Sequence, residues 1–178
     1  LGKNFINYID NKEILIVARN SSNLIFLKNK SNVNVRRYKF SLIELKLDDL
    51  DCSKSIFYEF AWHGVYGSER NNLNQFKVNV PLVVSSIEFA VMLSCKHWVG
   101  IGSQAEYGNY NRTILDNDVC NPKTLYGKSK FYCSQIASDL CKNNNLNFSW
   151  LRLFSVYGPD DNHDWLIQYL IKKMLLNE

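Results

Sequence analysis

Short apolar runs alternate with longer segments of helical spacing along the 178 residues of the chain. Each apolar run is bounded by polar or turn-forming residues, a pattern typical of buried strands. Strands are predicted over residues 13–18, within 33–43, and over 56–62, 97–103 and 148–156.

The segments between these runs carry apolar residues at the helical period. Helices are predicted over residues 1–10, over 23–30 as a short element, from Leu73 to Cys95, from Pro122 onward and over 166–178. Pro81 is expected near a helix start, because inside a helix it would remove a hydrogen bond and cause a kink. Asn121 is a plausible N-cap for the helix that opens with Pro122.

Strands that alternate with helices predict an α/β fold, a doubly wound parallel sheet with both faces covered. In such sheets, ligands bind beyond the carboxyl ends of the strands. Polar and small residues at those ends are therefore the candidates for a functional site.

Composition excludes several classes of protein. Hydrophobic residues make up 46% of the chain and charged residues 21%, as in ordinary soluble domains. The net charge of +4 comes from scattered basic residues, so no nucleic-acid partner is expected. No apolar run approaches a bilayer span and no signal-peptide pattern opens the chain. We therefore expect no membrane partner and a cytoplasmic location.

Cysteine and histidine give no metal-binding pattern. The three histidines lie far apart, and the cysteines show neither CxxC nor another ligand spacing. No metal site is predicted, and the thiols are interpreted as reduced. The cysteines are Cys52, Cys95, Cys120, Cys133 and Cys141.

Arg19, the Ala61–Gly64 turn and Asn79 each allow two interpretations. Arg19, after the first strand, can pair with the 2′-phosphate of a dinucleotide or lie solvated on the surface. Ala61 and Gly64, at and just beyond the end of the third strand, can admit a flat ligand or form an ordinary turn beside a core tryptophan. Asn79 can hold that turn by hydrogen bonds or cap the long helix.

A serine, a tyrosine and a lysine form the strongest candidate constellation. Tyr126 and Lys130 lie four residues apart and share a helix face. A lysine ammonium near a phenol lowers a pKa that is ordinarily about 10. The pair alone is weak evidence, but Ser103 ends a predicted strand upstream. Together the three residues favour catalysis.

These stretches resemble the extended short-chain dehydrogenase/reductase family. GSQAEYG (102–108), PKTLYGKSK (122–130) and LRLFSVYGPDD (151–161) match its motifs in order and spacing, and FAWHGV (60–65) looks like its cofactor-facing loop. The likeness covers essentially the whole chain. Within this family, the chain most resembles NAD-dependent epimerase/dehydratase members, including nucleotide-sugar epimerases and CDP-abequose synthase-like reductases. It implies a Rossmann-like fold and oxidoreductase chemistry on a nucleotide sugar, at C4, as an epimerase or 4-ketoreductase.

The resemblance implies a role for each matching residue. Tyr126 would be the acid/base, Lys130 would lower its pKa and bind the nicotinamide ribose, and Ser103 would hydrogen-bond the reacting oxygen. Cofactor contacts are expected from Gly2, Arg19, Ala61, Trp62, Asn79, Tyr126, Lys130 and Phe154. Substrate contacts are expected from Ser103, Gln104 and Ser155. Many family members carry an asparagine where this chain has Ser155.

Two departures from the family pattern narrow the subclass. Family dehydratases carry Asp-Glu directly after the residue that matches Ser103, whereas this chain has Gln104 and Ala105, with Glu106 one place late. Dehydration is therefore disfavoured. Arg19 leans toward NADP over NAD, and an exchangeable NADPH suits a ketoreductase. A tightly held NAD suits an epimerase, and both activities stay open.

The ends of the chain suggest a fragment of a longer enzyme. Gly2 matches the third glycine of the family's glycine-rich loop, so the first strand is expected to be missing and the sheet to lack its central strand. Residues 1–158 are interpreted as an incomplete NAD(P)-binding domain and 159–178 as the start of a substrate-binding region.

Other functions stay open at this point. One alternative is a non-catalytic binding or scaffold protein with a degenerate dinucleotide fold. Another is an unrelated doubly wound protein, such as a methyltransferase. By analogy with the family, a homodimer can form through the helix after Leu73 and the Tyr126 helix. The sugar and the nucleotide are not predicted.

Overall fold

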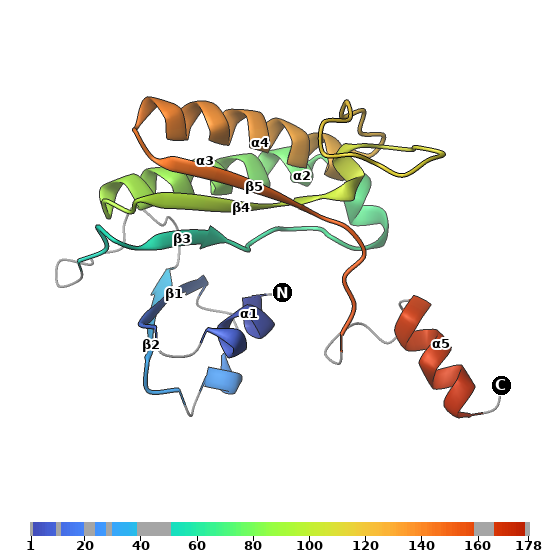
Figure 1. The fold of residues 1–178 in the computed structure, drawn as a ribbon, viewed down its shortest axis with the longest axis horizontal. Helices are drawn as coiled ribbons and strands as arrows, with labels where there is room; N and C mark the ends of the chain where they lie inside the picture. The colour runs from blue at the N-terminus through green and yellow to red at the C-terminus, as the bar shows by residue number, and fades with distance from the viewer. Residues whose placement is uncertain are drawn as a thin grey trace.

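The structure is a computed structural model that describes residues 2–9, 12–19, 24–27, 30–38, 51–158 and 166–176. Its strands form two parallel sheets. The first sheet pairs β1 (Ile14–Arg19) with β2 (Val33–Tyr38). The second has the order β3-β4-β5 (Figure 1) and is formed by β3 (Ile56–Glu59), β4 (His97–Ser103) and β5 (Asn147–Leu153). Parallel pairing throughout confirms the predicted α/β class.

Helices connect these strands. The N-terminal part contains α1 (Gly2–Tyr8) and the short 3₁₀ helix η1 (Ile25–Leu27). The remaining elements, in chain order, are η2 (Gly67–Asn71), α2 (Asn74–Lys77), α3 (Asn79–Met92), η3 (Gln104–Glu106), α4 (Leu125–Asn143) and α5 (Leu166–Leu175). Short strands alternating with helices along the sequence correspond to the alternation of apolar runs and amphipathic segments.

The main hydrophobic core lies between the three-stranded sheet and the helices α3 and α4, which run side by side along it (Figure 1). Trp98 of β4 is fully buried and stacks on Phe148 and Trp150 of β5, with ring centroids 6.1 and 6.2 Å apart. Small residues on α4 let the helix approach these rings closely. The buried members of this core are Val83, Ile87, Ala90, Trp98, Cys133, Ala137, Cys141 and Leu146.

The two sheets pack against the same helix without hydrogen-bonding to each other among the described residues. Leu15 and Val17 of β1 and Phe57 of β3 surround Phe89 of α3. The interruption between β1 and β3 agrees with the expectation of a sheet without its central strand. On the opposite face of β3, the ring of Phe5 from α1 contacts two aromatic rings, those of Tyr58 and Phe60.

Several predicted boundaries need correction. The helix expected from Pro122 begins at Leu125, and its N-cap is Thr124, whose Oγ1 accepts a hydrogen bond from Gly127 N at 3.1 Å. Asn121 lies in the loop before the helix, where its backbone N–H donates to Tyr107 O, 3.2 Å away, and it is not the cap. The helix expected from Leu73 is divided at Val78 into α2 and α3, and Pro81 lies in the first turn of α3 as predicted.

Two strands end earlier than predicted. β3 ends at Glu59 rather than residue 62, where the Glu59 side chain accepts a hydrogen bond from Ala61 N and turns the chain. β5 ends at Leu153 rather than residue 156, and Phe154 and Ser155 follow it as exposed, irregular chain. Both early ends leave polar groups at the edge where the strands finish.

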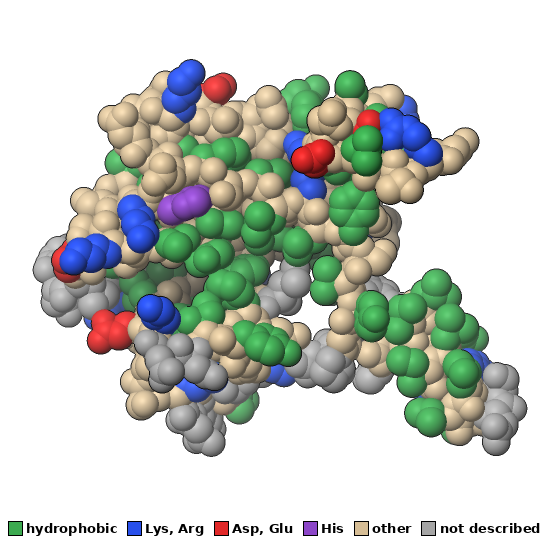
Figure 2. Space-filling model, viewed as in Figure 1, with side chains coloured by type: hydrophobic (Ala, Val, Ile, Leu, Met, Phe, Trp, Pro, Cys, Tyr) green, Lys and Arg blue, Asp and Glu red, His purple; other side chains and the backbone are tan. Residues whose placement is uncertain are grey.

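The C-terminal helix α5 exposes most of its apolar side chains, which form the largely green body apart from the sheets in Figure 2. The helix over Leu166–Leu175 confirms the helix predicted at this end of the chain. The domain boundary between residues 158 and 159 stays a prediction. Within the described residues, no helix combines the length and apolar character needed to cross a bilayer.

Candidate active site

The start of α4 lies against the carboxyl end of β4. Gly127 makes this approach possible, because a Cβ at that position would collide with Ala105 O in η3. Tyr126 and Lys130 are therefore held in the first turns of α4 beside Ser103, the last residue of β4. The Ser103 hydroxyl lies close enough to the Tyr126 phenol to lower the phenol's pKa as a hydrogen-bond partner. The structure thus brings together the three predicted catalytic residues.

A capping box fixes the backbone around Ser103. Its hydroxyl accepts a hydrogen bond from Ala105 N at 3.2 Å, and its own N–H donates to Glu106 Oε1 at 2.8 Å. The sequence S-Q-A-E has the spacing that this reciprocal arrangement requires. The serine hydroxyl is consequently held at the strand end while keeping its hydrogen-bonding capacity toward the phenol.

Lys130 is nearly inaccessible, with 4% of its surface exposed. Its ammonium lies 3.6 Å from the centroid of the Trp62 ring and donates a hydrogen bond to Ile101 O. Burial lowers the pKa of Lys130 to about 8, although the carboxylates of Glu106 and Glu59 favour the charged form. A buried ammonium with further N–H donors can bind hydroxyl groups of a ligand.

The expected lowering of the Tyr126 pKa by Lys130 is not found. Burial raises the pKa of Tyr126, against smaller lowering effects from the Ser103 hydrogen bond and the positive charge of Arg70. The Arg70 guanidinium lies 4.4 Å from the centroid of the phenol ring. The phenol is therefore held in its protonated form near neutral pH, and Arg70, not Lys130, is the cation that faces it.

Glu59 places a carboxyl group in the interior beneath this cluster. Its Oε1 accepts a hydrogen bond from Ala61 N at 2.6 Å. Burial raises the pKa of Glu59 to about 7, despite that hydrogen bond and the positive charge of Lys130. The Glu59 carboxyl therefore keeps its proton at a higher pH than an exposed glutamate does.

Asn79 holds the loop after β3 and does not act as a helix cap. Its Oδ1 accepts from His63 N at 2.7 Å, and its Nδ2 donates to His63 O at 3.0 Å. Gln75 braces the same loop by accepting from Trp62 Nε1 at 3.0 Å and donating to Gly64 O. Gly64 has φ +74°, a conformation that glycine adopts without strain. The fully buried amide network therefore shapes the loop that presents Ala61 and Trp62.

The other predicted site residues lie outside the Ser103–Tyr126–Lys130 cluster. Gly2 opens α1 and Arg19 is exposed at the end of β1, both in the N-terminal part. Gln104, Phe154 and Ser155 are exposed at the ends of β4 and β5. Phe154 contacts Tyr107, with ring centroids 6.0 Å apart. Their roles in binding stay predictions.

Sequence reasoning missed Glu59 and Arg70 as members of this site. A single carboxylate inside an otherwise apolar strand was a usable signal for Glu59, because such a group is rarely buried without a partner. Arg70 follows an irregular glycine-containing loop, and nothing in its sequence context points to Tyr126.

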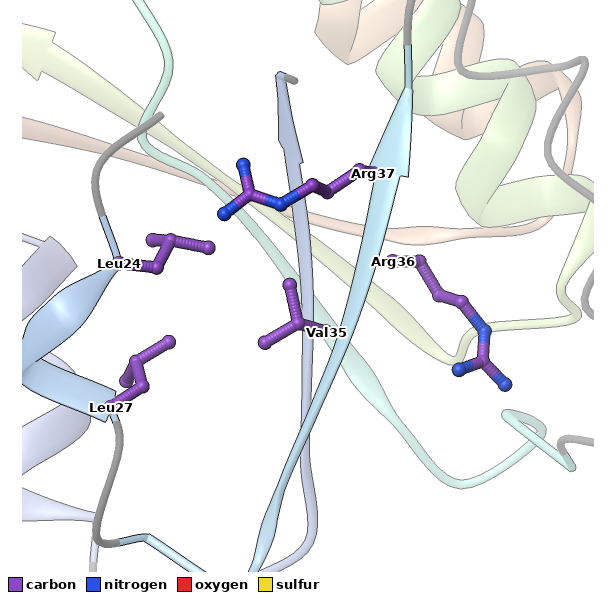
Figure 3. Close-up of a pocket in the computed structure, with 5 residues that line it drawn as sticks. All are labelled: Leu24, Leu27, Val35, Arg36 and Arg37. Atoms are coloured by element: carbon purple, nitrogen blue, oxygen red, sulfur yellow. The ribbon is translucent and has the colours of Figure 1, made fainter. Parts of the chain in front are cut away.

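A cavity of about 430 Å³ lies away from this cluster, against β2. Figure 3 shows Arg37 reaching across it toward Leu24, while Arg36 points to the opposite side of the strand. Val35 and Leu27 complete its lining. The cavity includes none of the predicted site residues. In the described part of the chain, no group of histidine, cysteine or acidic side chains could hold a metal ion.

Comparison with known proteins extends these observations. A model of the NAD dependent epimerase/dehydratase family matches residues 1–178. Among curated proteins, the dTDP-6-deoxy-L-talose 4-dehydrogenase (NAD(+)) of Aggregatibacter actinomycetemcomitans is 25% identical over 135 residues, which are 75% of this chain and 48% of that protein. The chain thus spans about half the length of this relative.

Solved structures show the same fold. The UDP-N-acetylglucosamine 4-epimerase of Methanobrevibacter ruminantium M1, in complex with UDP-N-acetylmuramic acid, superposes with a TM-score of 0.78 at 20% identity, over 99% of this chain and 60% of that one. MoeE5 in complex with UDP-glucuronic acid and NAD gives 0.73 at 24% identity, over 97% of this chain and 57% of that one. At these identities the likeness concerns the fold alone.

Proposed function

The chain belongs to the NAD dependent epimerase/dehydratase family, and from this premise we propose that the full-length protein is a nucleotide-sugar oxidoreductase acting at sugar C4. The observation that carries the proposal is the placement of Ser103 beside the Tyr126 phenol, with the Lys130 ammonium buried one helical turn away. The curated relative and the solved neighbours act on or bind dTDP- and UDP-sugars, which supports this substrate class.

The residues of the cluster suit proton transfer at a sugar oxygen. Tyr126 would give its phenolic proton to a C4 ketone or take one from a C4 hydroxyl, and Ser103 would hold that oxygen by a hydrogen bond. The protonated phenol favoured by burial suits donation to a ketone, which is the direction of a 4-ketoreductase. In an epimerase the same phenol would work in both directions.

A nicotinamide cofactor fits the donors and surfaces around the cluster. When bound, it would supply or accept the hydride at C4. The backbone after β3 is open at Ala61, and Lys130 offers N–H donors suited to ribose hydroxyls. Ala61, Trp62, Asn79 and Phe154 would form or support this pocket, and Gly2 would lie near its pyrophosphate end. Gln104 and Ser155 would contact the sugar.

The reaction itself is testable with purified full-length protein and UDP- and dTDP-hexoses. We expect either interconversion of the C4 epimers with enzyme-bound cofactor, or reduction of the corresponding 4-keto sugars with loss of nicotinamide absorbance. NMR of the products distinguishes the two activities. Absence of both turnovers, with cofactor bound, would favour the alternative of a non-catalytic binding protein.

Arg19 is proposed to select NADPH over NADH. It ends β1 with its side chain exposed, and Arg37 lies on the adjacent strand, donating a hydrogen bond to Arg19 O at 2.9 Å. Two guanidinium groups at neighbouring strand ends suit a 2′-phosphate. The compared proteins use or bind NAD, which favours NADH over NADPH, and a titration with both cofactors decides between the two.

Titration of the full-length protein with each cofactor tests this selection. We expect NADPH to bind about tenfold more tightly than NADH, since one charge-assisted contact contributes about 1.4 kcal/mol or more. Arg19→Glu is expected to reverse the preference, whereas Lys54→Glu, the same charge change at an exposed position before β3, should leave it intact. Tighter binding of NADH by the unaltered protein would contradict the assignment.

A further inference from the structure

We propose that Glu106 is a positioning residue of this site, which fixes Ser103 opposite Tyr126 and places a buried negative charge beside the phenol and the Lys130 ammonium. The inference rests on the proposed function insofar as Tyr126 is taken as the acid/base. Glu106 lies in η3, outside the set of residues assigned above to catalysis or ligand binding.

The carboxylate of Glu106 joins the ends of two strands. It is fully buried, with 0% of its surface exposed. Oε1 accepts hydrogen bonds from Ser103 N at 2.8 Å and Trp150 Nε1 at 3.0 Å. Oε2 accepts from Arg152 Nε at 2.8 Å and lies 3.1 Å from the same indole nitrogen. One side chain of η3 thus ties the last residue of β4 to two residues of β5.

Glycine in β4 makes room for this arrangement. A Cβ at Gly102 would lie 2.5 Å from Glu106 Oε1 and would collide with Trp150 Nε1. A Cβ at Gly100 would collide with the Trp150 ring. Side chains at either position would push the indole or the carboxylate away from Ser103. The two glycines of the GIGS sequence therefore allow the Glu106 carboxylate and the Trp150 indole to lie close to the strand backbone.

The charges around the phenol come from every element that packs near it. Arg70 faces the ring from η2, Glu106 acts from η3, and Lys130 lies on the same helix. Arg152 of β5 pairs directly with Glu106 and stacks over Tyr107 at 5.1 Å. Burial is the largest influence on the pKa of Tyr126 and raises it, whereas Ser103 and Arg70 lower it. The negative charge of Glu106 is a smaller influence that raises this pKa further.

The same carboxylate also helps keep Lys130 protonated. Burial lowers the pKa of this lysine, and Glu106 is the largest of the influences that oppose the lowering. A structural ion pair with Arg152 alone would not need to affect the phenol or the ammonium. The proposal therefore predicts a change at Tyr126 when the charge of Glu106 is removed.

The test is a tyrosinate absorbance titration of the full-length protein with and without Glu106→Gln. The contribution of Tyr126 is isolated by subtracting the titration of the corresponding Tyr126→Phe protein in each background. We expect the Tyr126 midpoint to move to lower pH in Glu106→Gln. We also expect kcat/KM to fall about 10- to 100-fold, as for a small misplacement of a reacting group.

Two further variants make the outcome decisive. Glu88→Gln removes the same charge from an exposed position on α3 and should change neither quantity. Glu106→Gln together with Arg152→Gln leaves no unpaired, half-buried guanidinium, and it serves where the single variant does not fold. Arg152 is not among the groups that influence the Tyr126 pKa, so the double variant should show the same shift to lower pH.

An unchanged Tyr126 midpoint in a folded variant overturns the electrostatic part of the proposal. Wild-type kcat/KM in that variant overturns the positioning part. The titration requires no substrate, so it is informative even if the unaltered protein shows no turnover of nucleotide sugars. A failure of the proposed function and a failure of this inference are thereby distinguished.

Discussion

Replacing Tyr126 with phenylalanine in the full-length protein is expected to lower kcat/KM for its nucleotide sugar by about 10²- to 10⁴-fold, the usual contribution of a positioned acid/base. The substitution removes only the phenolic oxygen. The ring would keep its contact with Trp62, at 6.1 Å between centroids, and its place beneath Arg70. Helix α4 and the fold should therefore be preserved, and the loss should reside in kcat.

The measurement pairs steady-state kinetics with cofactor binding. Tyr132→Phe is the matched control, because Tyr132 lies on the same helix with 52% of its surface exposed. We expect Tyr132→Phe to retain wild-type kinetics, and both variants to bind the nicotinamide cofactor as the unaltered protein does. Full activity in Tyr126→Phe would remove the phenol from the mechanism and would leave Ser103 and Lys130 as binding groups only.

The raised pKa of Tyr126 adds a pH dependence to this expectation. If the phenol donates its proton to a ketone, kcat/KM of the unaltered protein should fall only in the alkaline range, as the phenol ionises. If it removes a proton from a hydroxyl, activity should instead rise with pH over the same range. The pH profile thus links the state of the phenol to the choice between reduction and oxidation at C4.

Periodicity predicted the elements of the fold where packing and local pattern agree. β4 was predicted with its observed limits because the residues after His97, WVGIGS, are apolar, β-branched or small, and the strand is bounded by Lys96 and the polar Gln104. Helix α5 was predicted from its amphipathic spacing alone. In these segments the local sequence is sufficient, since no distant residue has to decide the boundary.

Boundaries set by side-chain hydrogen bonds were not predictable in the same way. The start of α4 depends on the Thr124 hydroxyl, which accepts the hydrogen bond from Gly127 N and caps the helix in place of Asn121. The end of β3 depends on the Glu59 side chain folding back onto Ala61 N. Both are decisions between competing polar partners, and a sequence pattern does not rank such partners.

The site shows the same division. The Ser103, Tyr126 and Lys130 set was predicted from residue type and spacing, because a strand end and a helix face bring the three together in any fold of this class. Its electrostatics were not predicted. Lys130 reaches Trp62 and Ile101 O, and the cation over the phenol ring comes from Arg70, a residue of a separate 3₁₀ helix. Tertiary packing alone determines which charge faces which group.

Replacing Glu59 with glutamine is expected to make the protein more stable at pH 7.5 but not at pH 4.5. The Glu59 pKa is about 7 in the folded state, against 4.5 for the unperturbed group. Because the folded-state value is raised, the folded protein holds a proton that the unfolded chain releases between these pH values. The stabilisation associated with this proton is present below pH 4.5 and is lost as the pH rises through 7.

The expected size of the effect follows from that interval. At about 1.4 kcal/mol for each tenfold change in proton affinity, ionising Glu59 in the interior costs about 3 kcal/mol of unfolding free energy by pH 7.5. Glutamine has the same shape, can accept from Ala61 N and does not ionise. The stability of Glu59→Gln relative to the unaltered protein should therefore rise by about 3 kcal/mol between pH 4.5 and 7.5.

Urea unfolding at a series of pH values measures this difference, with Glu88→Gln as the exposed control that should follow the unaltered protein throughout. Parallel pH profiles for Glu59→Gln and the unaltered protein would show that Glu59 ionises without cost. Compensation would then have to come from the Lys130 ammonium, the cation that acts on this carboxyl. In that case the acid and the lysine form an ion pair beneath the site, and Lys130→Met should destabilise the unaltered protein more than it destabilises Glu59→Gln.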